Sequence, residues 1–127
     1  MPNTLEIGNK LVAFCRANEN LQAVDGLYAT NIVSIEAQEF PGMPRRTEGL
    51  PAVRARNEHW LNNNDVHSAT VEGPFPHDDR FIVYFEYDFT TKSGPMAGKR
   101  TKMKEAGLYT VKDGKIAREE FFYHMGG

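Results

Sequence analysis

The feature that most constrains the fold is a run of alternating side chains between Arg80 and Lys92. Its large apolar residues are separated by single positions: Phe81, Val83, Phe85, Tyr87 and Phe89. The positions between them include Tyr84, Glu86 and Asp88. Because successive side chains of a β-strand point to opposite faces, this pattern predicts a long strand with one buried face. Such a strand needs neighbouring strands and a second layer that covers its apolar side.

The first half of the chain predicts helices. Thr4 is the candidate N-cap of a first helix, in which Leu11, Val12, Phe14 and Cys15 recur near helical spacing before residues 18–20 break the pattern. A second, short helix is predicted at 21–28. A strand is predicted at 32–37 because Ile and Val favour the pleated state.

A loop is predicted over residues 38–49, which contain Pro41, Gly42, Pro44 and the pair Arg45 and Arg46. Pro51 suits the first turn of a third helix that runs to about residue 62. The residues expected on the buried side of this helix are Val53, Asn57, Trp60 and Leu61.

The second half predicts strands at 66–72, 80–92, 99–111 and 115–125, with a break at Gly73 and Pro74 and turns at 76–79 and around Gly94. No composition shift or linker divides the 127 residues, so we expect a single domain over 1–127. The predicted fold class is α+β: a cone-shaped barrel in which N-terminal helices pack on a curved, mostly antiparallel sheet around an apolar pocket.

The last two strands are joined around Asp113 and Gly114, and two registers are open. A two-residue turn pairs Val111 with Ile116, whereas a three-residue loop with a bulge pairs Val111 with Lys115. A slip of one residue turns every side chain of one strand to the other face. The apolar pattern favours the bulged register, which gathers one set of residues on the inner face: Met103, Glu105, Gly107, Tyr109, Val111, Ala117, Glu119, Phe121 and Tyr123.

That register places two carboxylates, Glu105 and Glu119, among aromatic side chains. A carboxylate in an apolar site raises its pKa, binds a cation or faces a wet cavity, and a raised pKa suits an acid or a base at neutral pH. We therefore predict Glu105 and Glu119 as candidate catalytic residues. The structural alternative is that Glu105 pairs with Arg100, Lys102 or Arg118 or lies at the wet rim, or that Glu119 faces outward in the other register.

Several functional classes are disfavoured. The net charge is −2, so no basic excess favours nucleic-acid binding. The four histidines have no ligand spacing, which predicts no metal site and no metal cofactor. The single cysteine, Cys15, is expected to be a small core residue rather than a nucleophile. No signal peptide or membrane span is apparent, which fits a cytoplasmic protein.

The order helix, helix, strand, helix and long antiparallel run resembles the nuclear transport factor 2-like superfamily, and within it the SnoaL-like and ketosteroid-isomerase-like domains. The stretches that carry the resemblance are LYATNIVSIEA (27–37), PGMPRRTEGLPAVRARNEHW (41–60), RFIVYFEYDF (80–89) and AGLYTVKDGKIAREEFFY (106–123). The resemblance implies a cone-shaped fold around a small-molecule pocket.

Ketosteroid isomerase uses an Asp base with a Tyr and a protonated Asp as the oxyanion hole. By resemblance, these positions fall at or beside Ala37, with Glu36 next to it, at Phe14 and near Gly107. These residues lack the required side chains, so the resemblance disfavours steroid isomerisation. Proton transfer by a pocket carboxylate or histidine, as in SnoaL-like cyclases, stays open, and Glu105 lies on the same face as Gly107.

Two functions are therefore expected as alternatives. The first is a cofactor-free acid/base enzyme that acts on a small hydrophobic or carbonyl compound. The second is a non-catalytic ligand-binding module, or a homodimer formed through the outer sheet face with Leu108, Ile116 and Phe122. In both, a small hydrophobic ligand is expected to contact a set of pocket residues: Phe14, Tyr28, Asn57, Trp60, Phe85, Tyr87, Tyr109, Phe121 and Tyr123.

Overall fold

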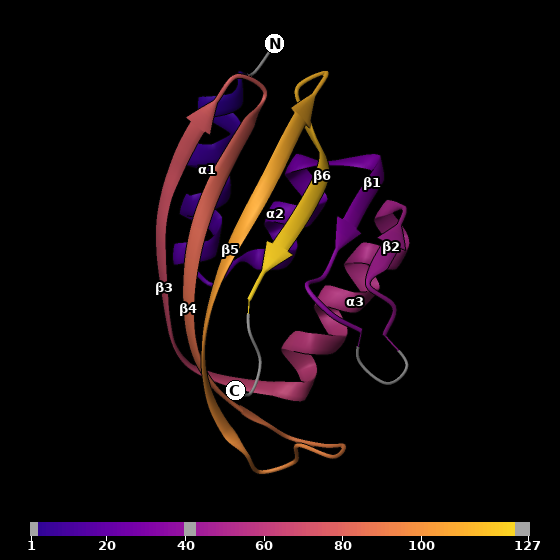
Figure 1. Ribbon diagram of the computed structural model, residues 1–127, viewed down its shortest axis with the longest axis vertical. Coiled ribbons are helices and arrows are strands. Elements are labelled where there is room, and N and C mark those ends of the chain that lie inside the picture. Colours follow the sequence, from indigo (N-terminus) through magenta and orange to yellow (C-terminus); the bar gives the residue numbers. More distant parts are fainter. Residues whose placement is uncertain (1–2, 40–42, 124–127) are drawn as a thin grey trace.

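The computed structural model describes residues 3–39 and 43–123 and confirms the α+β class. Its elements follow the order α1 (Thr4–Arg16), α2 (Asn20–Leu27), β1 (Tyr28–Ile35), β2 (Arg46–Glu48), α3 (Leu50–Asn63), β3 (Asn64–His77), β4 (Arg80–Thr91), β5 (Arg100–Lys112) and β6 (Lys115–Phe122). The six strands form one curved sheet in the order β2-β1-β6-β5-β4-β3 (Figure 1). Only β1 and β6 are parallel neighbours among these strands.

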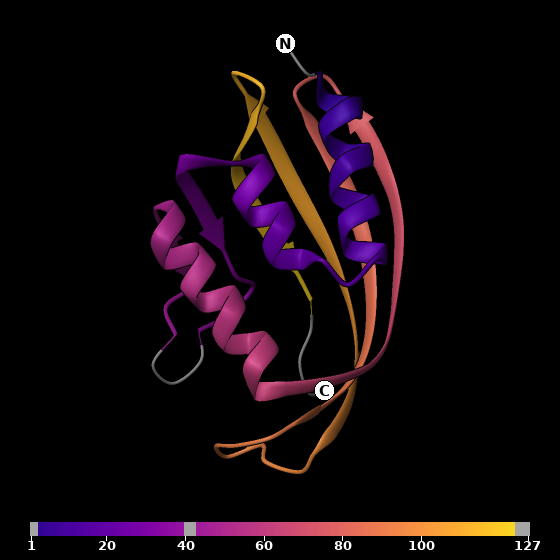
Figure 2. The ribbon, with the colours of Figure 1, turned by 180° about the vertical axis from the view of Figure 1, so that it is seen from behind.

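All three described helices lie on one face of the sheet (Figure 2). Helix α1 packs on β3 and β4, and α3 lies over β1 and β2. Gly8 allows the close approach of α1, because a Cβ atom there would lie 2.7 Å from Cβ of Pro74. The opposite, outer face of the sheet carries no helix in the described part of the chain, so the inner face alone is covered.

The alternation in β4 is confirmed. Phe81, Val83, Phe85 and Phe89 are buried on the inner face, whereas Tyr84 is exposed on the outer face. The apolar residues of α1 complete this core, and burial of each such side chain contributes about 1.5–3 kcal/mol to folding. Val53 of α3 is also fully buried, as predicted.

Several predicted boundaries are wrong by a few residues. The N-cap of α1 is Asn3 rather than Thr4, because the Asn3 side chain accepts a hydrogen bond from the Glu6 amide. Strand β1 covers residues 28–35 instead of 32–37. The short strand β2 lies inside the predicted loop and pairs with β1.

Strand β3 is twice as long as the predicted strand 66–72, with 14 residues. It passes Gly73 and Pro74 through a shift in its register with β4 rather than ending there. Pro41 and Gly42 of the predicted loop, and positions 124–125 of the predicted last strand, lie outside the described residues.

The β5–β6 hairpin combines the two registers considered from the sequence. The turn has two residues, Asp113 and Gly114, both with positive φ, so Val111 pairs with Ile116. A shift after this pair then places Thr110 opposite Arg118, which leaves Ala117 as the extra residue of a bulge. The predicted turn was wrong, but the bulge returns Glu119 to the predicted inner face. Ile116, predicted on the outer face, is instead fully buried.

Candidate functional site

The most deeply buried carboxyl group in the described core belongs to Glu119 of β6, whose exposed fraction is 1%. The Tyr28 hydroxyl donates a 2.6 Å hydrogen bond to its Oε2 atom. The Ser34 hydroxyl donates a 3.1 Å bond to its Oε1 atom. Ser34 is the direct neighbour of Glu119 in the parallel β1–β6 ladder, so strand register itself brings these two residues together.

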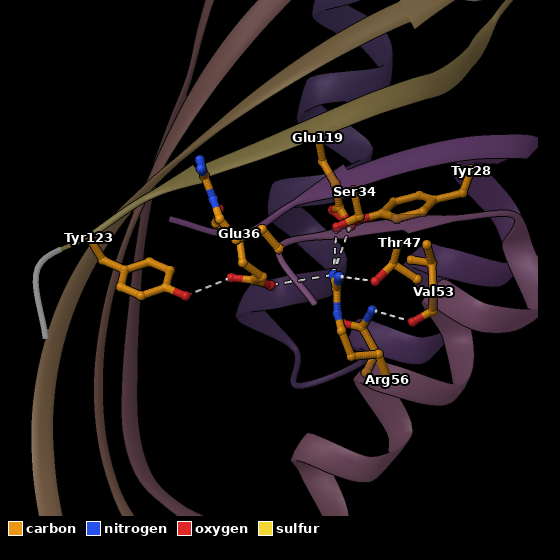
Figure 3. Close-up of polar contacts among 10 residues, drawn as sticks. Tyr28, Ser34, Glu36, Thr47, Val53, Arg56, Glu119 and Tyr123 are labelled. Atoms are coloured by element: carbon orange, nitrogen blue, oxygen red, sulfur yellow. Dashed lines mark hydrogen bonds and ion pairs between the residues drawn. The ribbon is translucent and has the colours of Figure 1, made fainter. Parts of the chain in front are cut away.

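Helix α3 contributes the cation of this cluster, Arg56. Its Nη2 atom donates a 2.5 Å hydrogen bond to Ser34 Oγ and lies 3.9 Å from Glu119 Oε1. The same atom lies 3.4 Å from Glu36 Oε1, and Nη1 donates to Thr47 of β2 (Figure 3). One guanidinium group therefore bridges two carboxylates and joins α3 to the sheet.

The chain of contacts ends near the rim of the sheet at Tyr123. Its hydroxyl donates a 2.9 Å hydrogen bond to Glu36 Oε2 (Figure 3). Both oxygens of Glu36 thus have a partner, Arg56 on one side and Tyr123 on the other. Glu36 follows β1 two positions after Ser34, which explains why both side chains point to the same side.

Burial raises the pKa of Glu119 to about 7. The hydrogen bond from Tyr28, the charge of Arg56 and the hydrogen bond from Ser34 act against that rise, whereas the charge of Glu36 adds to it. Burial also raises the pKa of Tyr28 well above its ordinary value, so this phenol stays protonated and keeps donating to Glu119. The result is a carboxyl group that changes its charge near neutral pH.

Glu105 of β5 differs from Glu119 in its contacts. It lies opposite Phe85 in the β4–β5 ladder, on the inner face, and it is half-buried. No hydrogen bond or ion pair joins its carboxyl group to any other residue within 3–39 and 43–123. Burial, followed by the charges of Glu36 and Glu119, raises the pKa of Glu105 to about 8, against the charge of Arg56. Glu105 is therefore a carboxyl group with a raised pKa and without a fixed partner in the described part of the chain.

Two hollows border this region. One of about 210 Å³ lies at the ends of β1 and β6, and its lining includes Ile35, Glu36, Arg45, Glu120, Phe121 and Tyr123. The other, of about 370 Å³, is lined mostly by outer-face residues, which include Glu72, Tyr84, Glu86, Lys104 and Phe122. Glu36 and Tyr123, which are joined by a hydrogen bond, both line the first hollow.

The relatives agree with this architecture. A family model described as the SnoaL-like domain matches residues 3–123. The chain belongs to the SnoaL-like family. A solved structure from Mesorhizobium loti, named for a SnoaL-like polyketide cyclase and for a carbohydrate phosphatase, is 37% identical to this SnoaL-like domain. That similarity covers 93% of this chain and 97% of the other, with a TM-score of 0.85.

More distant structures show the fold alone. An NTF2-like protein from Burkholderia thailandensis is 19% identical, covers 98% of this chain and 92% of its own, and has a TM-score of 0.78. A Catenulispora acidiphila protein with a ketosteroid isomerase-like fold, solved with trimethylamine, is 14% identical and has a TM-score of 0.70. The similarity covers 97% of this chain and 88% of that protein. No curated protein matches the SnoaL-like domain described here.

The structure brings most of the predicted site residues to the inner face of this SnoaL-like domain. Tyr109 is 2% exposed and stacks on Phe81 with ring centroids 5.0 Å apart, so it belongs to the packed core. Tyr87 stacks on Phe85 at 5.7 Å, and Trp60 packs near Tyr87 at 5.9 Å. The part of the expected pocket next to α1 is therefore filled by side chains.

The remaining predicted residues are placed less centrally. Phe14 packs, partly buried, against the core. Asn57 uses its amide to donate to the Val53 carbonyl within α3. Phe121 lines the smaller hollow and meets the edge of Tyr109, with ring centroids 6.2 Å apart. Cys15 is buried, and burial followed by the charges of Glu119 and Glu105 raises its pKa to about 12, which favours the inert thiol.

Sequence reasoning missed the roles of Ser34, Thr47 and Arg56. Ser34 carried a signal, because it lies between Val33 and Ile35 and two positions before Glu36. Arg56 carried none, since a helix arginine is usually solvated. Within the described ranges, no three His, Cys, Asp or Glu side chains are arranged to hold a metal ion. None of the helices described is long and apolar enough to cross a membrane.

Proposed function

We propose that this SnoaL-like domain is a cofactor-free enzyme that moves a proton on a small apolar carbonyl compound. The observation that carries the proposal is the contrast between Glu105, which has no partner among the described residues, and Glu119, which is held by Tyr28 and Ser34. A general acid must be free to place its proton on the substrate, and both oxygens of Glu119 already accept hydrogen bonds from the protein.

In the proposed reaction Glu105 is the acid and Glu36 the base. The protonated Glu105 carboxyl donates its hydrogen to the carbonyl oxygen of the substrate, and Glu36 accepts the proton from the neighbouring carbon. The products of this step are an enol, an ionised Glu105 and a protonated Glu36. Glu36 then gives its proton to another carbon of the unsaturated enol while the ionised Glu105 takes back the hydroxyl proton, which regenerates the carbonyl and both carboxyl groups and completes an isomerisation. Tyr123 and Arg56 orient Glu36 through the contacts that already engage its two oxygens.

Glu119 acts indirectly in this proposal. Its charge raises the pKa of Glu105, and its hydrogen bonds with Tyr28 and Ser34 hold β6 to β1 beneath Arg56 and Glu36. Two close carboxyl groups titrate as a pair, so ionisation of one disfavours ionisation of the other. This arrangement keeps an acid available on Glu105 near neutral pH.

The test is hydrogen–deuterium exchange on 2-tetralone in D₂O, followed by proton NMR. The enzyme should accelerate exchange beside the carbonyl, and the acceleration should fall as pH rises through about 8, where Glu105 loses its proton. Glu105→Gln should abolish this pH dependence, and Glu58→Gln on the exposed side of α3 should leave it unchanged. A pH–rate profile that Glu105→Gln does not alter contradicts the assignment.

A second candidate function is self-association, and we propose that two copies pair through the outer sheet face. Phe75, Tyr84 and Phe122 are there 52%, 48% and 52% exposed, and the rings of Phe75 and Tyr84 contact one another with centroids 5.6 Å apart. Contiguous apolar patches of this kind often mark interaction sites.

The charges of this face favour a second copy as the partner. Residues that lie opposite one another on neighbouring strands form rows across this face. Glu72, Tyr84 and Ala106 form one row, and Lys102 lies in the second row beyond it. The row between them contains the ion pair of Glu86 and Lys104. A two-fold axis through that central row would bring Glu72 of one copy towards Lys102 of the other, which makes the face self-complementary.

A further inference from the structure

The smaller hollow combines an apolar wall with one arginine, Arg45. Phe121 and Ile35 form part of the wall, and Arg45 lies on the rim, in the segment that leads to β2. The Arg45 residue is fixed there by two bonds to Glu36: its carbonyl accepts from the Glu36 amide at 2.7 Å, and its Nε donates to the Glu36 carbonyl at 3.3 Å. The guanidinium group is therefore held beside the Glu36–Tyr123 pair.

The carboxylates that line the hollow are paired with other arginines, so none of them neutralises Arg45. Of the two carboxylates that line the hollow, Glu36 is paired with Arg56 at 3.4 Å and Glu120 with Arg118 at 2.7 Å. No carboxylate within residues 3–39 and 43–123 pairs with Arg45. The neighbouring Arg46 differs, because it lies 2.6 Å from Glu48. The lining thus contains one cation that is not neutralised within the described structure.

We propose that Arg45 determines specificity by binding the carboxylate of a small monocarboxylic acid whose apolar body lies on the Phe121 wall. A guanidinium group presents paired N–H donors that match a carboxylate, and such charge-assisted bonds are about twice as strong as neutral ones. The hollow of about 210 Å³ is smaller than the 300–1,000 Å³ typical of sites for drug-sized ligands. It fits a compound of one ring or a short chain.

This assignment rests on the proposed function, because it places the substrate beside Glu36, and it adds the chemical class of the ligand. With its carboxylate on Arg45, the rest of the substrate extends towards the Glu36 carboxylate and the Tyr123 hydroxyl. Repulsion between the ligand and Glu36 is reduced because Arg56 already pairs with Glu36.

The test is an NMR titration of the ¹⁵N-labelled protein with benzoate and with its neutral analogue benzamide. Benzoate should shift the amide signals of Ile35, Ala37 and Phe121 and bind about tenfold more tightly than benzamide, equivalent to about 1.4 kcal/mol. Arg45→Gln should lower the benzoate affinity to that of benzamide. Arg46→Gln is the matched control and should leave the preference intact.

Equal affinities for the two probes, an unchanged preference in Arg45→Gln, shifts that map elsewhere or no binding of either probe would overturn the inference. The outcome is separable from that of the proposed reaction. Binding of benzoate through Arg45 without exchange of 2-tetralone would contradict the enzyme and leave the carboxylate site in place. Exchange of 2-tetralone without a preference for benzoate would contradict the carboxylate site and leave the proposed enzyme in place.

Discussion

Tyr28 and Glu119 lie 91 positions apart in the chain and are joined by a buried 2.6 Å hydrogen bond. The phenol comes from the first residue of β1, and the carboxyl group comes from β6, which runs parallel to β1. This bond fixes the inner end of a polar chain that continues through Ser34, Arg56 and Glu36 to the rim of the sheet. The polar cluster therefore depends on correct pairing of β1 with β6.

The first prediction concerns Tyr28→Phe. Loss of the donor should raise the pKa of Glu119 above about 7, because the bond from Tyr28 holds it down. It should also lower the free energy of unfolding by about 1–3 kcal/mol, since a buried acceptor loses a partner. Denaturant unfolding and a ¹³C titration of the Glu119 carboxyl carbon measure both effects. Tyr84→Phe, at an exposed site on the outer face, serves as the control, and equal effects of the two variants would refute the role of the bond.

The second prediction concerns Arg56→Met. The change leaves Glu36 and Glu119 without their shared cation and should destabilise the fold by about 3–5 kcal/mol, as expected when one partner of a buried ion pair is removed. Arg54→Met is a matched control on the same helix, because Arg54 pairs with Asp25 and Glu58 at the surface, where such pairs contribute about 0–1 kcal/mol.

A double variant sharpens this second test. When Glu119→Gln is combined with Arg56→Met, the buried charge that lacks a partner is removed, so part of the lost stability should return. Chemical denaturation of the four proteins gives the coupling energy of the pair. Strictly additive effects of the two substitutions would show that Arg56 and Glu119 do not act together.

Local pattern accounts for most of what the sequence predicts about the fold. The alternation of Phe81, Val83 and Phe85 depends only on the two-residue period of a strand, so the inner face of β4 was predicted correctly. The end of β3 was predicted wrongly, because Gly73 and Pro74 usually stop a strand. In the structure, pairing with β4 continues β3 to His77. Tertiary pairing overrode the local signal there.

The candidate site was predictable only in part, for the same reason. Glu119 was detected because strand alternation places it among aromatic residues. Its partners were not, because the contact between Arg56 and Ser34 joins a helix to a strand 22 residues away and has no periodic signature. The expected open pocket also depended on packing that periodicity does not describe, since Tyr109 and Phe81 fill its inner end.

The third prediction is a fall in stability with rising pH. The ordinary pKa of 4.5 is raised to about 7 in Glu119 and to about 8 in Glu105, so the folded state binds more protons than the unfolded state between these values. The stabilisation is complete below about pH 4.5 and is lost as pH rises to about 8. Each group contributes at most about 1.4 kcal/mol per pH unit over its own range.

Urea unfolding of the wild-type protein at a series of pH values between about 5 and 8.5 measures this slope. Glu119→Gln should remove about half of the slope between about pH 4.5 and 7, and Glu105→Gln should remove the other half together with the whole slope between about pH 7 and 8. Glu58→Gln, which changes an exposed helix carboxylate, should keep the full slope. A wild-type stability that rises over this range would contradict the raised pKa values.

The fourth prediction tests the outer sheet face. The exposed rings of Phe75, Tyr84 and Phe122 should be covered by a second copy, so the wild-type protein should sediment as a dimer at micromolar concentration. Phe122→Glu places a charge in the middle of this interface and should weaken the dimer at least about tenfold, because an unpaired charge is costly to bury. Leu5→Glu changes an equally exposed apolar residue on α1, on the other side of the sheet, and should leave the dimer intact. If the wild-type protein sediments as a monomer, or if both variants dissociate alike, the outer face is not the contact between copies.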